Sequence, residues 1–448
     1  MSADKRRRLA LVGAGARAEM FVRAITGPHP NGDRRAGRVE LVALADVNQS
    51  RMDAHNRWLR AAGHSPVPTY DAGDLATMLA AERVDQLLVT SVDRTHAGHI
   101  VTALEAGCDV LTEKPMTVDA ESARAILDAV ERTGRTVQVA FNYRFNPVHE
   151  VVRTLLAGGA VGEIGSVHFE WLLDVRHGAD YFRRWHRDKA NSGGLLVHKS
   201  GHHFDLINWW LQAAPVEVYA QGRLFLYGPD GKRHGYDRGY ERAHGSPAAL
   251  GDPFALDLAA SPRMKELYLD AEEEDGYHRD QSVFAPGVTI EDDLAVLVRY
   301  DTGATMTYHL TAYAPWEGYR LMVNGSKGRL ELEVIESDHV SPAAAGELKG
   351  AAVHGSEAAP EQGSVTLTLR PYWAPPQAIE LQPHERGGHG GADRRMTAVL
   401  FGGKNDPLAR SATARDGALA LLTGLAANRS LQTAAPVHVA DLLDLRTR

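Results

Sequence analysis

The stretch Leu9-Ala10-Leu11-Val12-Gly13-Ala14-Gly15-Ala16-Arg17-Ala18 decides the fold of the N-terminal part of the chain. A short apolar run leads into two glycines and then into helical spacing, which predicts a buried strand, a tight turn and the start of a helix. Gly13 would form the turn, Gly15 would let the backbone approach a pyrophosphate, and Ala18, in the third fingerprint position, would let the helix pack closely on the sheet. The N–H groups at the start of that helix would face the anion.

The N-terminal third alternates short apolar runs with amphipathic segments. The predicted strands are Leu9–Val12, Val39–Ala45, Gln86–Val89, Asp109–Thr112 and Thr136–Phe141. Strands and helices in alternation predict a parallel, doubly wound sheet. We therefore expect a Rossmann domain over residues 1–147 that binds NAD.

The sequence pattern changes after Pro147, where runs of β-branched and aromatic residues follow one another with short turns between them. These runs are Gly165–Val175, Val216–Tyr227, Ala295–Tyr300, Ala304–Ala312 and Arg329–Ile335. They predict a large, mainly antiparallel sheet in a second, α+β domain over residues 148–448. We expect surface insertions at 228–286 and 341–363, and C-terminal helices at 392–428 that pack back on the first domain.

Composition excludes several classes of protein. The net charge is −8 over 448 residues, with both signs mixed along the chain, so no basic face is available for nucleic acid. The single cysteine, Cys108, excludes an internal disulfide, and the apolar run after Arg6, Arg7 and Arg8 is too short for an export signal. No segment reaches the roughly 20 apolar residues needed to cross a bilayer, so we expect a cytoplasmic protein.

The second predicted strand ends in Leu44-Ala45-Asp46. A carboxylate at this point can accept hydrogen bonds from the adenosine ribose and would repel the extra phosphate of NADP, which favours NAD. Arg17 and Arg51 could soften that preference.

Further motifs identify a family. Four motifs follow the glycine turn in order along the chain: Ser91-Val92-Asp93-Arg94-Thr95-His96, Glu113-Lys114-Pro115, Phe141-Asn142-Tyr143-Arg144-Phe145-Asn146-Pro147, and Gly193-Gly194 leading to His203. Over about Leu9 to Pro215 the sequence resembles the Gfo/Idh/MocA family, the glucose-fructose oxidoreductase and inositol dehydrogenase group. The resemblance implies that the cofactor is held by Gly13, Gly15, Arg17, Ala18, Asp46, Ser91, His96, Glu113, Lys114, Asn142 and Arg144.

The resemblance also places Lys114 beside the nicotinamide and the reacting sugar hydroxyl. Oxidising an alcohol requires a base within reach of the O–H proton, and a lysine near a cationic ring should have a lowered pKa. The family's second signature carries an aspartate and, four residues later, a histidine. We match these positions to Lys199 and His203, so that a cation replaces the anion and the proton relay is altered.

The replacement suggests an anionic substrate. We expect Lys199 to recognise a carboxylate or sulfonate, with Arg183, His198 and Tyr143 also at the substrate. The neighbours Arg184, His186 and Arg187 could extend a positive pocket. Aromatic rings in a turn-rich stretch could line a sugar pocket: Tyr313, Trp316 and Tyr319. His198 and His202 have the i, i+4 spacing of zinc-binding helices with Asp205 close by, but hydride transfer needs no metal and we expect none.

Three functions remain open. The first is an NAD-dependent sugar oxidoreductase, acting at C3 as is common in related enzymes. The second is a redox-neutral glycosidase that acts on a uronide or sulfoquinovoside. It would oxidise the sugar, eliminate the aglycone, add water and reduce the carbonyl again, with the long insertion as a lid. The third is a non-catalytic NAD-binding regulator. The presence of both Lys114 and His203 is evidence against this alternative. The family resemblance further implies that the sheet of the second domain is open on one face and that this domain binds substrate and forms oligomers, so that the protein is a homo-oligomer, a dimer or tetramer.

Overall fold

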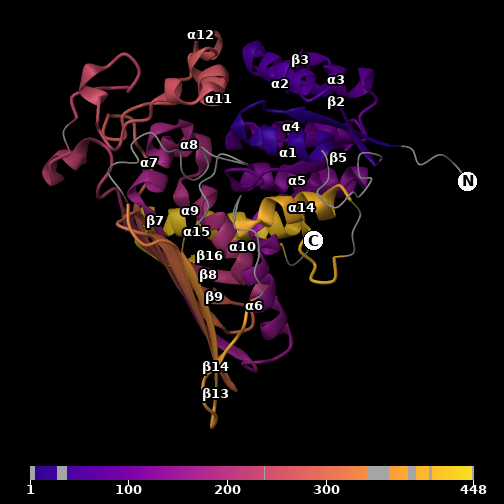
Figure 1. Cartoon of the computed structure of the whole chain (residues 1–448). Helices are drawn as coiled ribbons and strands as arrows, with labels where there is room; N and C mark the ends of the chain where they lie inside the picture. Colours follow the sequence, from indigo (N-terminus) through magenta and orange to yellow (C-terminus); the bar gives the residue numbers. More distant parts are fainter. Residues whose placement is uncertain are drawn as a thin grey trace, which may run out of the picture.

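The computed structural model describes residues 6–27, 38–236, 238–340, 363–381, 390–402 and 406–445. They form two sheets with helices around and between them (Figure 1). Of the helices within these ranges, none combines the length and apolar character that crossing a membrane requires.

The first sheet has the strand order β15-β6-β5-β4-β1-β2-β3. Its strands are β1 (Arg7–Val12), β2 (Val39–Asp46), β3 (Thr69–Asp71), β4 (Gln86–Val89), β5 (Asp109–Thr112), β6 (Val137–Val139) and β15 (Ala412–Thr413). All neighbours pair in parallel except β15, which runs antiparallel to β6. The strands alternate with α1 (Ala16–Thr26), α2 (Gln49–Ala61), α3 (Leu75–Ala81), α4 (His96–Glu105) and α5 (Ala120–Thr133). The predicted doubly wound sheet is confirmed.

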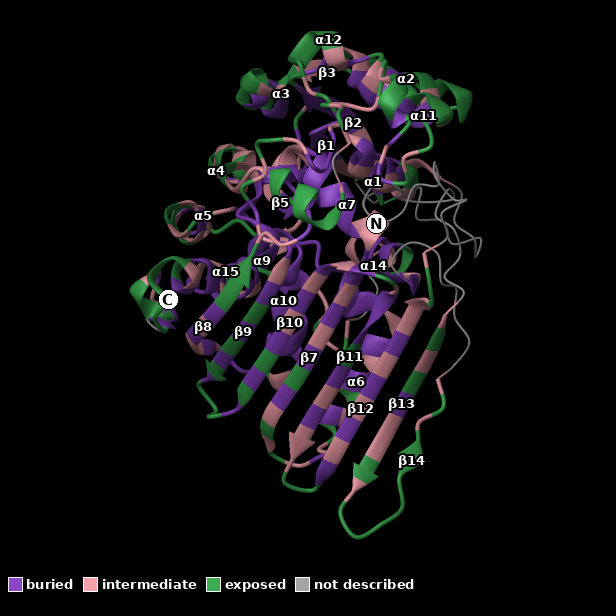
Figure 2. Ribbon diagram, turned by 90° about the vertical axis from the view of Figure 1, so that its left-hand side faces the viewer, coloured by how far each residue is buried: buried purple, intermediate pink, exposed green. Residues whose placement is uncertain are grey.

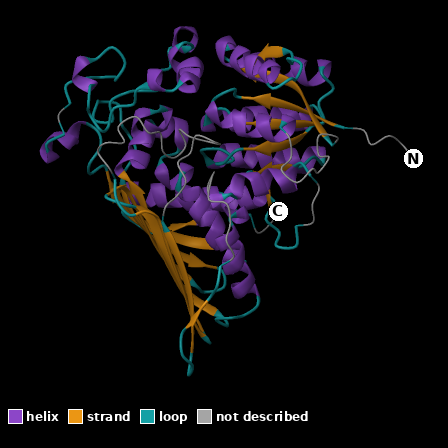
Figure 3. Cartoon of the chain, in the orientation of Figure 1, coloured by secondary structure: helices purple, strands orange, loops and turns teal. Residues whose placement is uncertain are grey.

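The second sheet has nine strands in the order β14-β13-β12-β11-β7-β10-β9-β8-β16. They are β7 (Ile164–Asp174), β8 (Pro215–Arg223), β9 (Asp293–Tyr300), β10 (Thr305–Ala314), β11 (Glu317–Gly325), β12 (Gly328–Ser337), β13 (Ser364–Pro371), β14 (Gln377–Ala378) and β16 (Val437–His438). Only β7 and β10 pair in parallel among them, so the predicted, mainly antiparallel sheet is confirmed. Helices cover one face, and the other face is open, with buried and exposed residues alternating along its strands (Figures 2 and 3).

The helices behind the second sheet connect it to the first. They are α6 (Pro147–Ala157), α7 (Val175–Arg183), α8 (Lys189–Ser192), α9 (Leu195–His198), α10 (Ser200–Leu211), α14 (Ala392–Leu400) and α15 (Ala414–Thr433). The aromatic run Phe204–Trp210 is buried inside α10, as its apolar spacing predicts.

The chain between β8 and β9 leaves the second sheet and crosses to the first. Its regular parts include α11 (Pro262–Met264) and α12 (Glu272–Asp275), which lie beside α2 in Figure 1. The backbone N–H groups of Gln49 and Ser50, at the start of α2, donate to the carboxylate of Glu274. The segment therefore docks on the Rossmann sheet. The second predicted insertion lies, apart from residue 363, outside the described residues.

Candidate active site

The glycine turn has the backbone that a dinucleotide site requires. Gly13 adopts a positive φ of 96°, and a Cβ there would lie 2.4 Å from the backbone nitrogen of Ser91, so only glycine fits. Helix α1 begins at Ala16, with its N-terminus facing the pocket. The N–H of Ala16 donates to the hydroxyl of Tyr268 at 2.9 Å, and that hydroxyl keeps its own proton to donate.

Asp46 ends β2 beside this turn. Its carboxylate accepts the Ala14 N–H at 2.5 Å and the Asn48 N–H at 2.9 Å, and it lies 3.7 Å from Arg51. Burial raises the pKa of Asp46, and Arg51 and the two N–H groups oppose the rise. Asp46 and Arg51 thus hold the end of the pocket where an adenosine ribose would bind.

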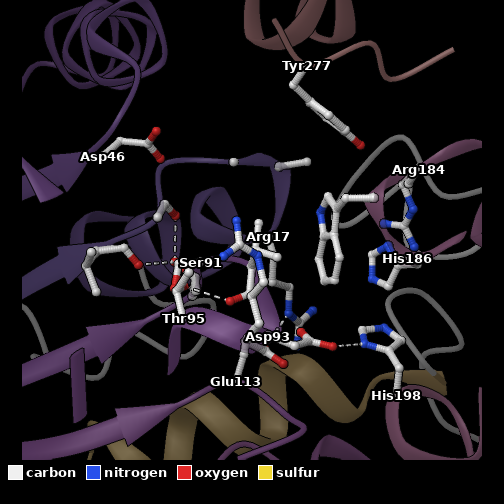
Figure 4. Close-up of a pocket in the computed structure, with 18 of the residues that line it drawn as sticks. Arg17, Asp46, Ser91, Asp93, Thr95, Glu113, Arg184, His186, His198 and Tyr277 are labelled. Carbon is white, nitrogen blue, oxygen red and sulfur yellow. Dashed lines mark hydrogen bonds and ion pairs between the residues drawn. The ribbon is translucent and has the colours of Figure 1, made fainter. Parts of the chain in front are cut away.

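A pocket of about 600 Å³ runs from this turn toward the helices behind the second sheet. Figure 4 shows Asp46 at one end, Arg17, Glu113 and Asp93 in the middle, and His186 and His198 at the other end. Arg17 is held by Glu113 at 2.5 Å and by Asp393 at 3.0 Å.

The middle of the pocket also offers unused hydrogen-bonding capacity. The buried Oδ1 of Asn142 has no hydrogen-bond partner among the described residues, while its Nδ2 donates to Asp393. A glycine cradle at one end and an open polar wall further along fit a dinucleotide that lies along the pocket.

Lys114 lies at the inner part of this pocket. Its ammonium donates to the carbonyl oxygen of His198 at 3.0 Å and lies 3.3 Å from Nε2 of the same residue. Nδ1 of His198 lies 2.5 Å from Oδ2 of Asp93. Carboxyl, imidazole and amine therefore form a chain, Asp93–His198–Lys114, which ends in the pocket.

Burial sets the protonation of this chain. It lowers the pKa of Lys114 to about 8, against the pull of Asp93 and Glu113, and Lys199 and Arg17 lower it further. Burial also lowers the pKa of His198 and raises that of Asp93. Lys114 is thus poised to exchange a proton near neutral pH.

Asp93, His186 and His198 also offer three ligand atoms within 4.8 Å of one another, the composition of a metal site. This is a different set from His198, His202 and Asp205, because Asp205 is paired with Arg144 at 2.6 Å. In the structure both nitrogens of His198 already face partners, the carboxyl of Asp93 and the ammonium of Lys114. We interpret the cluster as a proton relay.

The structure does not bring His203 to the pocket. Its ring is fully buried, stacks on Trp171 with centroids 4.1 Å apart, and bonds Tyr308 at 2.7 Å through Nδ1. His198 and His202 line the pocket instead. Both members of the pair His198 and His202 thus line the pocket, whereas of the pair that we matched only Lys199 does.

Lys199 does line the pocket. Its ammonium donates to the hydroxyl of Tyr143 at 3.1 Å and lies 4.9 Å from the centre of the Trp171 ring. Burial lowers its pKa to about 8, and Glu317 and Glu336 oppose this. Tyr143 lines the pocket too and stacks on His202.

Other predicted residues lie away from the pocket wall. Arg183 points to the carbonyl of Phe254, while its neighbour Arg184 lines the pocket. Tyr319 is buried in β11 against Trp171, Trp316 lies under Arg320, and Tyr313 packs on Phe225. The prediction that these three aromatic residues lie in a turn-rich segment is wrong, because Glu317–Gly325 is a strand.

Three predicted cofactor residues support the pocket from behind. Arg144 is buried between Asp205 and Asp416, His96 bonds the carbonyls of Pro115 and Ser91, and Ala18 is on the buried side of α1. Gly13, Gly15, Arg17, Asp46, Ser91, Glu113, Lys114 and Asn142 all line it.

Sequence reasoning missed several lining residues, among them Asp93, Tyr268, Tyr277 and Arg279. Asp93 lies inside a quoted motif but received no role, and Tyr268, Tyr277 and Arg279 come from the long excursion, which shows no sustained period.

Comparison with known proteins agrees with this geometry. Residues 7–141 match the family described as "Oxidoreductase family, NAD-binding Rossmann fold", and 153–439 match "Oxidoreductase family, C-terminal alpha/beta domain". The chain is 34% identical over 437 residues to the oxidoreductase YteT of Bacillus subtilis (strain 168), covering 92% of this chain and 94% of that protein. It is 31% identical over 157 residues to the D-glucoside 3-dehydrogenase of Escherichia coli (strain K12), covering 35% and 41%.

Among solved structures, the aldose-aldose oxidoreductase from Caulobacter crescentus, complexed with glycerol, is similar with a TM-score of 0.61 at 16% identity. The alignment covers 97% of this chain and 100% of that one. The chain thus belongs to the Gfo/Idh/MocA oxidoreductase family, with its NAD-binding Rossmann fold and C-terminal alpha/beta domain.

Proposed function

We propose that this protein oxidises a carbinol of an acidic sugar or glycoside with NAD, using Lys114 as the base. The observation that carries the proposal is the ammonium of Lys114, which is half-buried at the pocket wall and bonded to His198. NAD, when bound, would accept a hydride from the carbinol carbon.

Lys114 would take the hydroxyl proton as its neutral amine. The resulting ammonium lies within reach of Nε2 of His198, which can accept a proton while Nδ1 passes one to Asp93. The raised pKa of Asp93 suits a carboxylate that ends such a relay. In this proposal Lys114 is the catalytic residue. Asp93 is a positioning residue that acts on Lys114 through His198.

The carbon that reacts is proposed to be C3. The match to a relative named D-glucoside 3-dehydrogenase supports this choice. Incubating the protein with NAD and a panel of hexoses, hexuronates and glycosides tests it: NADH should form, and the oxidised product should carry its carbonyl at C3. No NADH from any member, with substrate unchanged, would contradict the proposal.

We propose NAD rather than NADP. Asp46 places a carboxylate at the ribose end, and both nearby arginines face carboxylates, Arg17 with Glu113 and Asp393 and Arg51 with Asp275 at 2.7 Å. The carboxylate of Asp46 would therefore repel the 2′-phosphate of NADP, and neither arginine has an uncompensated positive charge to offset that repulsion.

An Asp46→Asn variant tests this preference. The amide oxygen can still accept the Ala14 N–H, so the turn should survive while the negative charge is lost. The ratio of NADP to NAD affinity is expected to rise about tenfold, which corresponds to roughly 1.4 kcal/mol. Titrating both cofactors by fluorescence measures it, and an unchanged ratio would assign the selection to other groups.

The acidic substrate is proposed from the cations around the inner pocket, which include Lys114, Lys199, Arg184 and Arg279. A Lys199→Ala variant is expected to weaken binding of a hexuronate by about tenfold, because one nearby positive charge is lost. Binding of the matching neutral hexose should change less than about twofold. Equal losses on both sugars would show that Lys199 does not select charge.

A redox-neutral glycosidase is the second candidate, and the docked excursion favours it. Tyr268, Asp275, Tyr277 and Arg279 form one wall of the pocket, and Asn48 donates to the carbonyl of Ala271 at 2.8 Å. A segment fixed in this way would retain the cofactor, which suits a cycle in which the carbinol is oxidised, the aglycone leaves, water adds and the carbonyl is reduced again.

Incubation with a uronide or sulfoquinovoside in heavy water separates the two candidates. Deuterium at C2 with release of the aglycone and no accumulated NADH would identify the glycosidase. NADH equal to the oxidised product would identify the dehydrogenase. NAD that stays with the protein through dialysis would support retention independently of turnover.

We also propose a homo-oligomer built on the open face of the nine-stranded sheet, which no described helix covers (Figure 2). Light scattering of the purified protein tests it, and a monomer at micromolar concentration would contradict it.

A further inference from the structure

Three arginines and one carboxylate are buried together at the inner end of the pocket. Arg183 and Arg184 end helix α7, Arg279 comes from the excursion, and Asp180 lies one turn earlier on α7. Their exposed fractions are 7%, 8%, 2% and 2%. The group therefore holds more positive charge than its own carboxylate can balance.

Asp180 uses both of its oxygens on two of the arginines. Nη1 of Arg279 donates to Oδ1 at 2.9 Å, and Nε of Arg184 lies 3.1 Å from Oδ2. Arg183 donates to the carbonyl of Phe254 at 3.2 Å. The buried Nη2 of Arg184 has no hydrogen-bond partner among the described residues. An unpaired buried guanidinium nitrogen is costly, so an acceptor that reached Arg184 would lower that cost.

The unpaired edge belongs to a residue of the pocket wall. Arg184 and Arg279 line the pocket, whereas Arg183 does not. Figure 4 shows Arg184 beside His186, on the side of His198 and away from Asp46. This is the substrate end of the pocket under the proposed function, not the adenosine end.

We propose that Arg184 binds the anionic head of the sugar substrate, a carboxylate or sulfonate, with Asp180 and Arg279 fixing its guanidinium. The inference rests on the proposed function, which leaves the contact to the anion open. A planar guanidinium suits such an oxyanion, and it can offer two parallel donors. Lys199 is less suited to direct contact, since its ammonium already donates to Tyr143 and lies over two aromatic rings. Lys199 therefore contributes charge, and Arg184 contributes the contact.

Calorimetric titration in the presence of NADH tests this without turnover. The ligands are glucuronate, sulfoquinovose and glucose, and the variants are Arg184→Gln, Arg184→Lys and Arg183→Gln. Arg184→Gln is expected to weaken binding of the acidic sugars by about 30-fold and of glucose by less than threefold. Arg184→Lys should recover part of the loss. Arg183→Gln, which removes the same charge one residue away, should change the ratio of acidic to neutral affinity by less than threefold. The tighter of the two acids identifies the anionic head.

Thermal unfolding without ligand gives an independent readout. Arg184→Gln removes an unpaired donor but also one partner of Asp180, which Arg279 still holds, so the two effects oppose each other and Tm should change little. A fall of several degrees would make the guanidinium structural and overturn the inference, as would equal losses for Arg183→Gln and Arg184→Gln. If the parent protein binds neither acid more tightly than glucose, the anion site is wrong. NADH formed from neutral sugars would still support the oxidoreductase function.

Discussion

Replacing Lys114 by Met is expected to lower kcat/KM for sugar oxidation by about 10³-fold, within the 10²–10⁴-fold that a general base contributes. The thioether fills the volume but cannot take the hydroxyl proton. Folding should survive, because burial already disfavours the ammonium in the native state, as its lowered pKa indicates. Affinity for NAD, measured by fluorescence titration, should change little.

The pH profile of the parent enzyme should also show that Lys114 acts as the base. A base must be neutral to act, so kcat/KM for oxidation should rise with pH and level off above a pKa of about 8. The charged groups that set this value are Asp93, Glu113, Lys199 and Arg17, and the neighbouring imidazole is that of His198.

A matched control is Lys327→Met, at an exposed turn between β11 and β12, which should leave kcat/KM unchanged. A Lys114→Met enzyme within tenfold of the parent, or one whose rate still rises toward pH 8, would assign the base to another residue.

The fold was largely predictable from local pattern. The turn at Gly13 and the alternation of apolar runs with helical spacing determine the Rossmann sheet, because each of these features acts over a few residues. The strand Glu317–Gly325 was not predicted, since Pro315 and Gly318 read as turn residues. Its pairing with β7 on one side and β12 on the other is a tertiary contact that composition does not encode.

For two residues the sequence match differs from the pocket lining by one position, and that difference matters. We matched His203 and Arg183 to the pocket, where the structure has His202 and Arg184. Adjacent helical residues differ by about 100° in direction, so a shift of one residue turns a lining side chain into a core one. Lys199 has helical backbone angles between α9 and α10, so both i, i+4 pairs are compatible with the local geometry, and only tertiary packing decides which of them faces the pocket.

Asp93 shows what linear motifs leave out. We expected a relay without a carboxylate because Lys199 stood at the family's aspartate position. The structure supplies a carboxyl from the loop after β4, far from α9 in sequence, at 2.5 Å from Nδ1 of His198. Only the packing of that loop against α9 reveals the pairing.

The second large effect is therefore expected at Asp93. Asp93→Asn keeps the shape and can still accept a hydrogen bond from His198, but it cannot take a proton at the end of the relay. We expect kcat/KM to fall by about 10²-fold at neutral pH, with KM and NAD affinity little changed.

The direction of the pH shift separates a relay from a simple field effect. The negative charge of Asp93 raises the pKa of Lys114, so its loss should lower that pKa and move the rising limb of the profile toward acid. At neutral pH more of Lys114 would then be neutral, and a field effect alone would make the variant faster. A slower enzyme whose limb has moved to lower pH is therefore not explained by the larger neutral fraction of Lys114, and it supports a role of Asp93 in proton transfer.

His198→Asn supplies the partner measurement. It breaks the same chain in the middle, so the double variant should be no slower than the slower single variant, because residues that act as a unit are not additive. Losses that multiply would mean that Asp93 and His198 act separately. A faster Asp93→Asn enzyme at neutral pH would reduce Asp93 to a charge near Lys114.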